Sequence, residues 1–228
     1  MKISPLGDSA ITLDFADKSS DRARLLARTL SAAERLEGAN LPGVMDVTCA
    51  YESVAVFFDP ARIEQDFEDK IGALVSSAGI RALRKARKIE IPVCYDDEFA
   101  LDLARVASQT FLTGDAIIAL HSSIEYTVAC IGFVPGFPFL AGLSDKLRVP
   151  RLESPRTKVP AGSVAIANAQ AGIYPFESPG GWNVIGRTPL RLFRVNENPP
   201  TLLRAGDRVR FRRITRDEFD ACVKENSK

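Results

Sequence analysis

Residues 160–195 read PAGSVAIANAQAGIYPFESPGGWNVIGRTPLRLFRV, and their pattern indicates the fold of the second half of the chain. It contains three runs with strand character, at residues 162–167, 181–185 and 190–195, and turn signals such as Pro160-Ala-Gly and Pro179-Gly-Gly. A fourth run follows at residues 209–214. Many short strands with glycine and proline between them are typical of a β-barrel or a sandwich. We therefore expect one of these two architectures here.

Helical patterns lie on both sides of this β-rich region. Two short helices are expected at residues 97–111 and 113–122, the second capped by Thr113, and a strand is expected at residues 126–133. At the other end, Thr215-Arg-Asp-Glu218 has the spacing of a capping box and predicts a closing helix.

The first part of the chain has a different order of elements. It begins with an alternating strand, an amphipathic helix and two apolar runs that can pair as a hairpin. A second helix opens at Pro60, and residues 88–93 again have strand character. The order strand–helix–strand–strand–helix–strand is the ferredoxin-like arrangement. We therefore expect an α+β chain with a ferredoxin-like domain at residues 1–88 and a β-barrel domain at residues 89–228.

Composition and net charge limit the binding partners and the cellular location that we expect. The chain has 228 residues, 46% of them hydrophobic, and a formal net charge of +1. Near-zero charge gives no electrostatic reason to expect nucleic acid or an anionic membrane as partner. Residues 1–15 do not have the pattern of a signal peptide, and no window approaches the roughly 20 apolar residues of a membrane span. We expect a soluble, cytoplasmic protein.

The cysteines do not indicate a metal site. Cys49, Cys94, Cys130 and Cys222 are scattered, and the sole histidine, His121, is not near any of them in sequence. Buried free thiols are the simpler interpretation. We expect no bound metal, and any mechanism that needs two histidines within this chain is excluded.

Glycine and proline concentrate in one quarter of the chain. Eight of the 15 glycines and eight of the 14 prolines fall between Gly132 and Pro189, together with Trp182, the only tryptophan. Such segments build rigid binding sites from irregular backbone at little cost in chain entropy. Tight turns of a barrel would give the same composition, and both interpretations are open.

His121 is the natural candidate for a general acid or base near neutral pH. It lies at the end of a predicted helix, just before the loop that begins at Gly132. A histidine at this place can equally be a surface group that complements the helix dipole.

Two further motifs indicate an anionic ligand. Arg156 and Lys158 point to the same face of a strand, where a pair of cations suits a carboxylate or phosphate, although a solvated edge strand is an equal alternative. Gly180 and Gly181 before Trp182 permit close backbone approach and could form an anion-binding nest. The chain has neither GxxxxGK[ST] nor GxGxxG, so ATP binding by this chain alone is unsupported.

The same motifs resemble those of the KipI/PxpB family, which is also labelled allophanate hydrolase subunit 1 and subdomain C/D of the carboxyltransferase domain. The matching residues are His121, Tyr126, residues 132–140, residues 155–162, residues 172–175 and residues 178–182, with Gly7-Asp8-Ser9 and residues 203–211 near the two ends. One departure is Ala171, where the family usually has threonine, and a lost hydroxyl there could alter a contact with a ligand.

The resemblance implies a fold, an activity and partners. It implies a ferredoxin-like domain followed by a cyclophilin-like β-barrel, and a role as one subunit of an ATP-dependent 5-oxoprolinase. ATP would be a co-substrate of the complex, which would contain a KipA/PxpC-type subunit, often as a heterotetramer, and act with a PxpA-type protein. The alternatives are a histidine-kinase inhibitor or a subunit for carboxyl transfer to urea-derived substrates.

The residues that match the family's motifs form the predicted site. We expect catalytic roles for His121, Arg156 and Lys158. The expected substrate-binding residues are Phe133, Pro135, Gly136, Phe137, Gln170, Tyr174, Gly180, Gly181 and Trp182.

Overall fold

The computed structural model describes residues 1–16, 21–76 and 86–225, which form two compact units. The first unit is Met1–Ala86 and the second is Arg87–Lys228. The boundary predicted between residues 88 and 89 lies two residues further along and would divide strand β5 (Lys88–Cys94).

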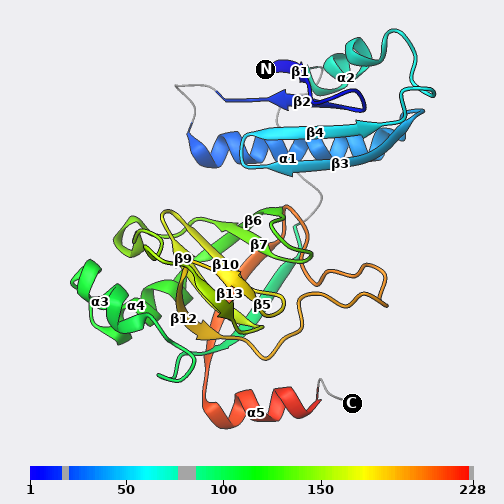
Figure 1. Cartoon of the computed structure of the whole chain (residues 1–228). Coiled ribbons are helices and arrows are strands. Elements are labelled where there is room, and N and C mark those ends of the chain that lie inside the picture. The colour runs from blue at the N-terminus through cyan, green and yellow to red at the C-terminus, as the bar shows by residue number, and fades with distance from the viewer. Residues whose placement is uncertain (17–20, 77–85, 226–228) are drawn as a thin grey trace. The chain divides into compact units, whose positions relative to one another are not determined.

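The first unit is a four-stranded antiparallel sheet with two helices (Figure 1). The strand order is β1-β2-β4-β3. Asp21 accepts a hydrogen bond from Ala23 N at the start of the first helix, and Asn40 ends it in a left-handed conformation. The elements are β1 (Lys2–Pro5), β2 (Ala10–Asp14), α1 (Arg22–Ala39), β3 (Val44–Ala50), β4 (Ser53–Phe58) and α2 (Phe67–Ser76).

One strand of the predicted ferredoxin-like order was assigned to the wrong unit. Residues 88–93 were expected to complete the first sheet, but β5 pairs in parallel with β13 (Arg208–Ile214) in the second unit. In the first sheet β1 lies antiparallel beside β2, in the place where a ferredoxin-like sheet has its last strand. Strand propensity does not specify a partner, because burial against neighbouring strands decides it. The ferredoxin-like sheet arrangement therefore remains, with a different strand at one edge.

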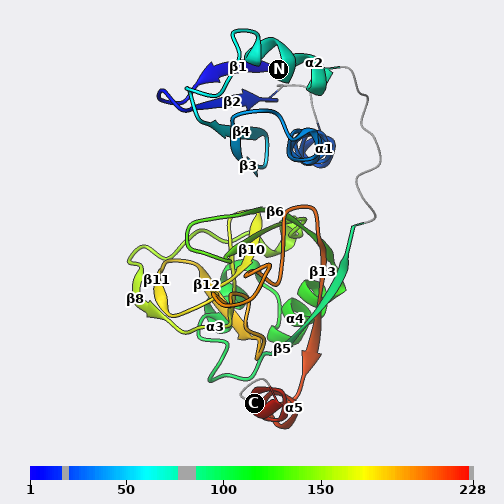
Figure 2. The ribbon, with the colours of Figure 1, turned by 90° about the vertical axis from the view of Figure 1, so that its right-hand side faces the viewer.

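The second unit is a cyclophilin-like closed barrel with the strand order β10-β7-β6-β13-β5-β12-β9. Strands β8 and β11 form a separate two-stranded sheet beside it (Figure 2). The predicted fold class, an α+β chain with this barrel, is confirmed. The remaining elements are α3 (Leu103–Thr110), α4 (Gly114–Ser123), β6 (Glu125–Ile131), β7 (Pro138–Ala141), the short 3₁₀ helix η1 (Asp145–Leu147), β8 (Arg156–Val159), β9 (Ser163–Ala167), β10 (Gln170–Ile173), β11 (Ser178–Gly180), β12 (Asn183–Arg187) and α5 (Arg216–Glu225).

Most of the predicted barrel elements are present, and one is not. The runs at residues 162–167, 181–185 and 209–214 correspond to β9, β12 and β13. The run at residues 190–195 is not a strand and makes only an isolated bridge, Phe193 to Thr201. The apolar residues of this run serve the barrel core instead, since Leu192 is 1% exposed and packs there.

The predicted capping box at the last helix is confirmed. Thr215 N donates to Glu218 Oε2 at 2.8 Å, and Glu218 N donates to Thr215 Oγ1 at 3.3 Å. These two hydrogen bonds satisfy backbone donors that the first turn of α5 leaves without partners.

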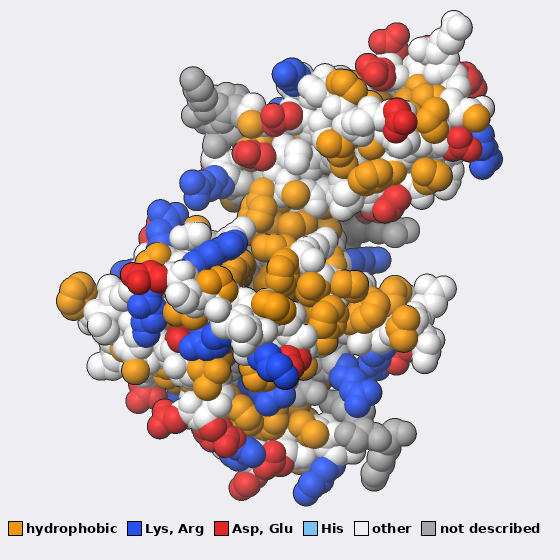
Figure 3. Space-filling model, viewed as in Figure 1, with side chains coloured by type: hydrophobic (Ala, Val, Ile, Leu, Met, Phe, Trp, Pro, Cys, Tyr) orange, Lys and Arg blue, Asp and Glu red, His pale blue; other side chains and the backbone are white. Residues whose placement is uncertain are grey.

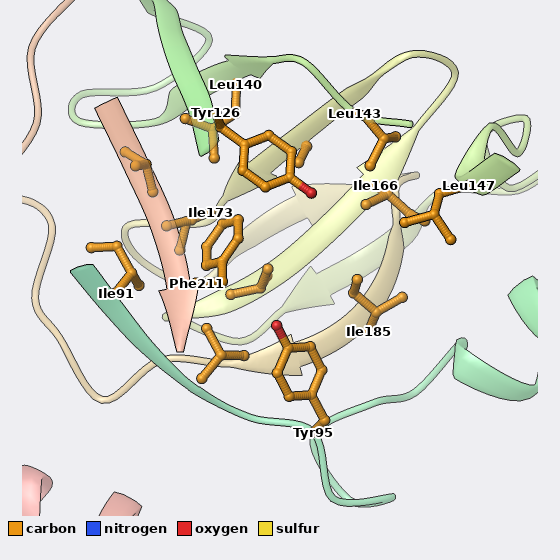
Figure 4. Packing of buried hydrophobic residues seen from close by; sticks show 14 of the residues in the cluster. Ile91, Tyr95, Tyr126, Leu140, Leu143, Leu147, Ile166, Ile173, Ile185 and Phe211 are labelled. Atoms are coloured by element: carbon orange, nitrogen blue, oxygen red, sulfur yellow. The ribbon is translucent and has the colours of Figure 1, made fainter. Parts of the chain in front are cut away.

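The barrel wall separates two apolar clusters. Val164 and Ile166 of β9 point into the interior, whereas Ala165 and Ala167 of the same strand belong to an outer cluster. Alternation along a strand produces this division, because successive side chains point to opposite faces. The interior cluster contains Tyr95, Tyr126, Phe211 and aliphatic side chains from around the barrel (Figure 4).

Three further observations bear on the sequence expectations. No helix in residues 1–16, 21–76 or 86–225 is long and apolar enough to cross a membrane. No group of three or more metal-ligating side chains occurs among these residues. None of the four cysteines forms a disulfide within the described residues; Cys49, Cys94 and Cys130 are buried and Cys222 is half-buried.

Candidate functional site

The outer cluster is built around three aromatic side chains that sequence analysis placed in the site. Phe137 lies edge-on to Tyr174 and to Trp182, with ring centroids 5.2 and 5.6 Å away. All three rings are at least 95% buried. Phe133 packs edge-on against Phe137 at 5.6 Å but remains 63% exposed. In Figure 3 hydrophobic side chains gather over part of the visible face of the barrel unit, with Lys and Arg side chains beside and between them.

Two glycines let the backbone approach these rings. A Cβ at Gly172 would lie 2.7 Å from the Phe137 ring, and one at Gly180 would lie 2.2 Å from Tyr174 Oη. Both distances are shorter than real carbon contacts, so a larger residue would displace an aromatic ring. Gly181 has no such contact, because its nearest neighbour would be Pro155 at 3.5 Å. Of the two adjacent glycines, Gly180 is therefore the one that the packing of the aromatic rings requires.

Arg156 is fixed by a buried carboxylate. Its Nη2 and Nη1 donate to Oδ1 and Oδ2 of Asp102 at 2.7 and 2.9 Å. Asp102 occupies the N-cap position of α3 but makes no capping bond with its side chain. Instead its Oδ2 also accepts from Val184 N at 2.7 Å, which ties α3, β8 and β12 together.

Arg151 is a second cation at this cluster, and sequence analysis missed it. Its guanidinium carbon lies 5.8 Å from the centroid of the Trp182 ring. Burial raises the pKa of the Tyr174 hydroxyl, while a hydrogen bond from the Trp182 backbone and the charges of Arg151 and Arg156 act in the opposite direction. Both guanidiniums thus act on the same hydroxyl. No spacing rule in the sequence connects two arginines five positions apart in an irregular segment.

Lys158 differs from Arg156 in its surroundings. Its side chain is 76% exposed, and Nζ lies 3.1 Å from Glu177 Oε1. This pair joins β8 to the turn before β11. The arrangement matches the solvated edge strand that sequence analysis left open for this position.

The other predicted site residues lie around the cluster at different depths. Pro135 is exposed, and Gly136 is buried in a turn with φ +82°. Gln170 is half-buried at the start of β10, where it pairs with Ala141 of β7 and Ala167 of β9.

His121 is not part of this cluster. Its side chain is 0% exposed, and its ring stacks on Phe211 at 4.4 Å inside the barrel. Nδ1 lies 2.8 Å from the Tyr95 hydroxyl, and the Tyr126 hydroxyl donates to the His121 carbonyl oxygen at 3.1 Å. Figure 4 shows both tyrosines directing their hydroxyl groups into the barrel. The dipole-complementing surface role left open for His121 is therefore wrong.

Burial also changes the acid–base character of this histidine. It lowers the pKa of His121 to about 3, so the imidazole is neutral near pH 7. Nε2 has no hydrogen-bond partner among the described residues. The predicted role of His121 in proton transfer stays a prediction, and this placement does not favour it, because the wall of the barrel separates the ring from the outer cluster.

Ala171 also faces the interior. It is 0% exposed, belongs to the interior cluster, and pairs with Leu140 and Ile166. A threonine hydroxyl at this position would point into an apolar core, so its absence removes no contact on the outer cluster.

Most of the sequence matches a known family model. The model described as carboxyltransferase domain, subdomain C and D, matches residues 1–203. The chain belongs to this family. The resemblance inferred from the motifs is confirmed.

Relatives of similar length have a common name. The chain is 39% identical to the 5-oxoprolinase B subunit of Bacillus subtilis over 99% of this chain and 98% of that protein. It is 40% identical to the 5-oxoprolinase B subunit of Haemophilus influenzae over 92% of this chain and 97% of that protein.

Solved structures contain the same fold within longer chains. The crystal structure of TTHA0988 matches with a TM-score of 0.77 and 40% identity over 90% of this chain. The present chain spans 40% of that protein's length. The urea amidolyase of K. lactis matches with a TM-score of 0.74 over 98% of this chain and 15% of that protein. Its sequence identity is 21%, so this match concerns the fold alone.

Proposed function

We propose that this chain is the B subunit of an ATP-dependent 5-oxoprolinase. The observation that carries the proposal is the match to two proteins with that subunit name, at 39 and 40% identity over nearly the whole length of both chains. The overall reaction converts 5-oxoproline and ATP to glutamate, ADP and phosphate. One water is consumed by ring opening and a second by hydrolysis of ATP.

In the proposed complex, partner subunits supply most of the ATP site. We propose a KipA/PxpC-type subunit as direct partner, assembled as a heterotetramer, and a PxpA-type protein as the third component, in the cytoplasm. The absence of both phosphate-loop patterns from the sequence supports placing the ATP site mainly on a partner. TTHA0988, in which the matching part is 40% of a longer chain, supports a close association between this fold and another chain or domain.

The outer cluster offers groups that suit the binding of 5-oxoproline. The substrate has a carboxylate and a lactam, and Arg156 offers a guanidinium held in a fixed orientation by Asp102. Transfer of the γ-phosphoryl group from ATP to the lactam oxygen would release ADP and activate the ring carbon for attack by the first water. The ring C–N bond then breaks as the nitrogen takes up a proton, which leaves γ-glutamyl phosphate. The second water hydrolyses this acyl phosphate to glutamate and phosphate. Fixed cations stabilise the negative charge that develops at the phosphoryl and carboxyl oxygens.

The test is release of glutamate from 5-oxoproline. The chain is assayed alone and then with its KipA/PxpC-type and PxpA-type partners, with and without ATP. Release only in the full mixture with ATP is the expected result. No release from a mixture in which the complex is shown to be assembled would overturn the proposal and favour another lactam, a urea-derived substrate or inhibition of a histidine kinase.

A further inference from the structure

The backbone on both sides of Arg151 is fixed. On one side, Asn183 Nδ2 donates to Pro150 O at 2.9 Å. On the other side, Leu152 N donates to Gly181 O at 2.7 Å. Asn183 is itself 0% exposed, and its Oδ1 accepts from Arg105 Nε at 3.1 Å. An irregular segment held in this way presents its side chain with little loss of entropy on binding.

The Arg151 side chain is positioned but not neutralised. It lies over the ring of Trp182, which is 5% exposed, and Arg151 itself is exposed. A guanidinium over an aromatic face keeps the N–H groups at its edge available for a ligand. No carboxylate lies within ion-pair distance of Arg151 among the residues that the structure describes. By contrast, the neighbouring Arg148 pairs with Asp145 at 3.3 Å.

Arg156 can contribute to the same ligand without leaving its carboxylate. A guanidinium has five N–H donors, and the pair with Asp102 uses one on each terminal nitrogen. Three donors therefore remain, and the Arg156 side chain is 29% exposed. Both arginines flank the same short segment of the outer cluster, because Arg156 pairs with Gly180 across β8 and β11 and Arg151 lies over the ring of Trp182, two positions further along.

We propose that Arg151 and Arg156 form a carboxylate-binding subsite on the outer wall of the barrel, which holds the carboxylate of 5-oxoproline in the assembled enzyme. The identity of the ligand rests on the proposed function, whereas the subsite itself rests on the geometry. Arg151 replaces Lys158 as the partner of Arg156 in this assignment, because Lys158 already pairs with Glu177.

Charge favours a carboxylate over a phosphate. Two guanidiniums and the single carboxylate of Asp102 leave one net positive charge at the subsite. A carboxylate carries one negative charge, whereas a phosphate group near neutral pH carries more than one. The subsite thus neutralises a carboxylate completely and a phosphate only in part.

The fluorescence of Trp182 can report the binding of a ligand to Arg151. It is the only tryptophan in the chain, and Arg151 covers its ring, so a ligand on Arg151 changes the environment of the sole indole. The experiment titrates the full chain with 5-oxoproline, acetate and inorganic phosphate while tryptophan fluorescence is recorded. The same titrations are made on Arg151→Gln and on Arg148→Gln, the matched control whose arginine already has a carboxylate partner.

The expected result is a saturable response to 5-oxoproline and acetate. Because a hydrogen bond to a charged group contributes on the order of 1.5–3 kcal/mol, Arg151→Gln should weaken this binding by about 10-fold or more. Arg148→Gln should bind like the wild type. In the assembled complex, Arg151→Gln should raise KM for 5-oxoproline by a similar factor, with little change in kcat or in KM for ATP.

Several results would overturn the inference. Wild-type affinity in Arg151→Gln, measured both by fluorescence and by KM, would remove Arg151 from the site. A response to phosphate with none to the carboxylates, or a raised KM for ATP alone, would assign the subsite to phosphate. If the complex has no 5-oxoprolinase activity but carboxylates still bind through Arg151, the subsite stands and only the proposed function fails.

Discussion

Arg87 donates from Nε to Oδ1 of Asp207 at 2.9 Å, and this contact joins the start of β5 to the turn that precedes β13. The same guanidinium donates to Leu202 O at 3.1 Å, and Asp207 Oδ2 accepts from Arg204 N at 2.9 Å. The Asp207 side chain is 1% exposed. A single buried carboxylate thus connects the two strands that run parallel in the barrel wall.

Replacing this carboxylate should destabilise the barrel. Asp207→Ala leaves the Arg204 N–H and part of the Arg87 guanidinium without an acceptor, which should lower the free energy of unfolding by about 2–4 kcal/mol. Denaturant unfolding of the full chain measures this. Arg204→Gln is the control, because its exposed side chain lies 3.7 Å from Asp207 and should cost less than about 1 kcal/mol. Equal losses for both variants would contradict the buried role of Asp207.

His121 should make stability depend on pH. Its folded pKa, about 3, is lower than the ordinary value of 6.5 because the ring is buried, so the unfolded chain binds a proton that the folded chain excludes. The stability that the folded chain gains by keeping His121 neutral is fully present above about pH 6.5 and is lost as the pH falls toward 3. Between about pH 3 and pH 6.5, the free energy of unfolding of His121→Gln should depend less steeply on pH than that of the wild type. The difference in slope should be up to about 1.4 kcal/mol per pH unit. Denaturant unfolding at several pH values gives both slopes.

The same variant distinguishes a structural histidine from a catalytic one. The groups that contact the ring, Tyr95, Tyr126 and Phe211, carry no charge near neutral pH, and burial raises the pKa of both tyrosines. We expect His121→Gln to retain kcat in the assembled complex once the folded fraction is taken into account. Loss of kcat with unchanged stability would instead support the acid–base role predicted from the sequence.

Local patterns predicted the parts of the fold that depend on neighbouring residues. The run with strand character at residues 162–167 predicted β9, and the spacing of Thr215 and Glu218 predicted the start of α5. The partner of β5 could not be predicted in this way, because pairing with β13 brings together residues such as Lys88 and Arg208 from distant parts of the sequence.

The candidate site was predicted only in part. The motifs that resemble the family grouped Phe137, Tyr174 and Trp182, and the structure brings these three rings together. The motifs also grouped His121 with these residues, although its ring stacks on Phe211 of the interior cluster and not on the outer cluster. Arg151 was missed because its position depends on a hydrogen bond between Asn183 and Pro150, which are 33 residues apart.

The two adjacent glycines should respond differently to the same substitution. A methyl group at Gly180 would collide with Tyr174, so Gly180→Ala should cost about 1–3 kcal/mol and alter the fluorescence of Trp182. At Gly181 the nearest atom is Pro155 Cγ at 3.5 Å, an ordinary contact, and Gly181→Ala should cost less than about 1 kcal/mol. Denaturant unfolding followed by tryptophan emission measures both effects. A larger loss at Gly181 than at Gly180 would refute this packing argument.

Asp102 should act through Arg156. Asp102→Asn removes the charge and one acceptor of the bidentate pair, and the Val184 N–H competes for the oxygen that remains. We expect the free energy of unfolding to fall by about 2 kcal/mol, because a buried charged hydrogen bond is lost. KM for 5-oxoproline should rise in the assembled complex, since the guanidinium of Arg156 is no longer held in one orientation.

A double-mutant cycle separates this coupling from general destabilisation. In the Arg156→Gln background, Asp102→Asn should cost less, with a coupling energy of about 1–2 kcal/mol. The cycle is measured by denaturant unfolding of the wild type, the two single variants and the double variant. The Lys158–Glu177 pair serves as the comparison, because both of its side chains are more than half exposed and its coupling should be below about 1 kcal/mol. Additive losses at Asp102 and Arg156 would show that the carboxylate does not orient the guanidinium, and the subsite would then lose its support on that side.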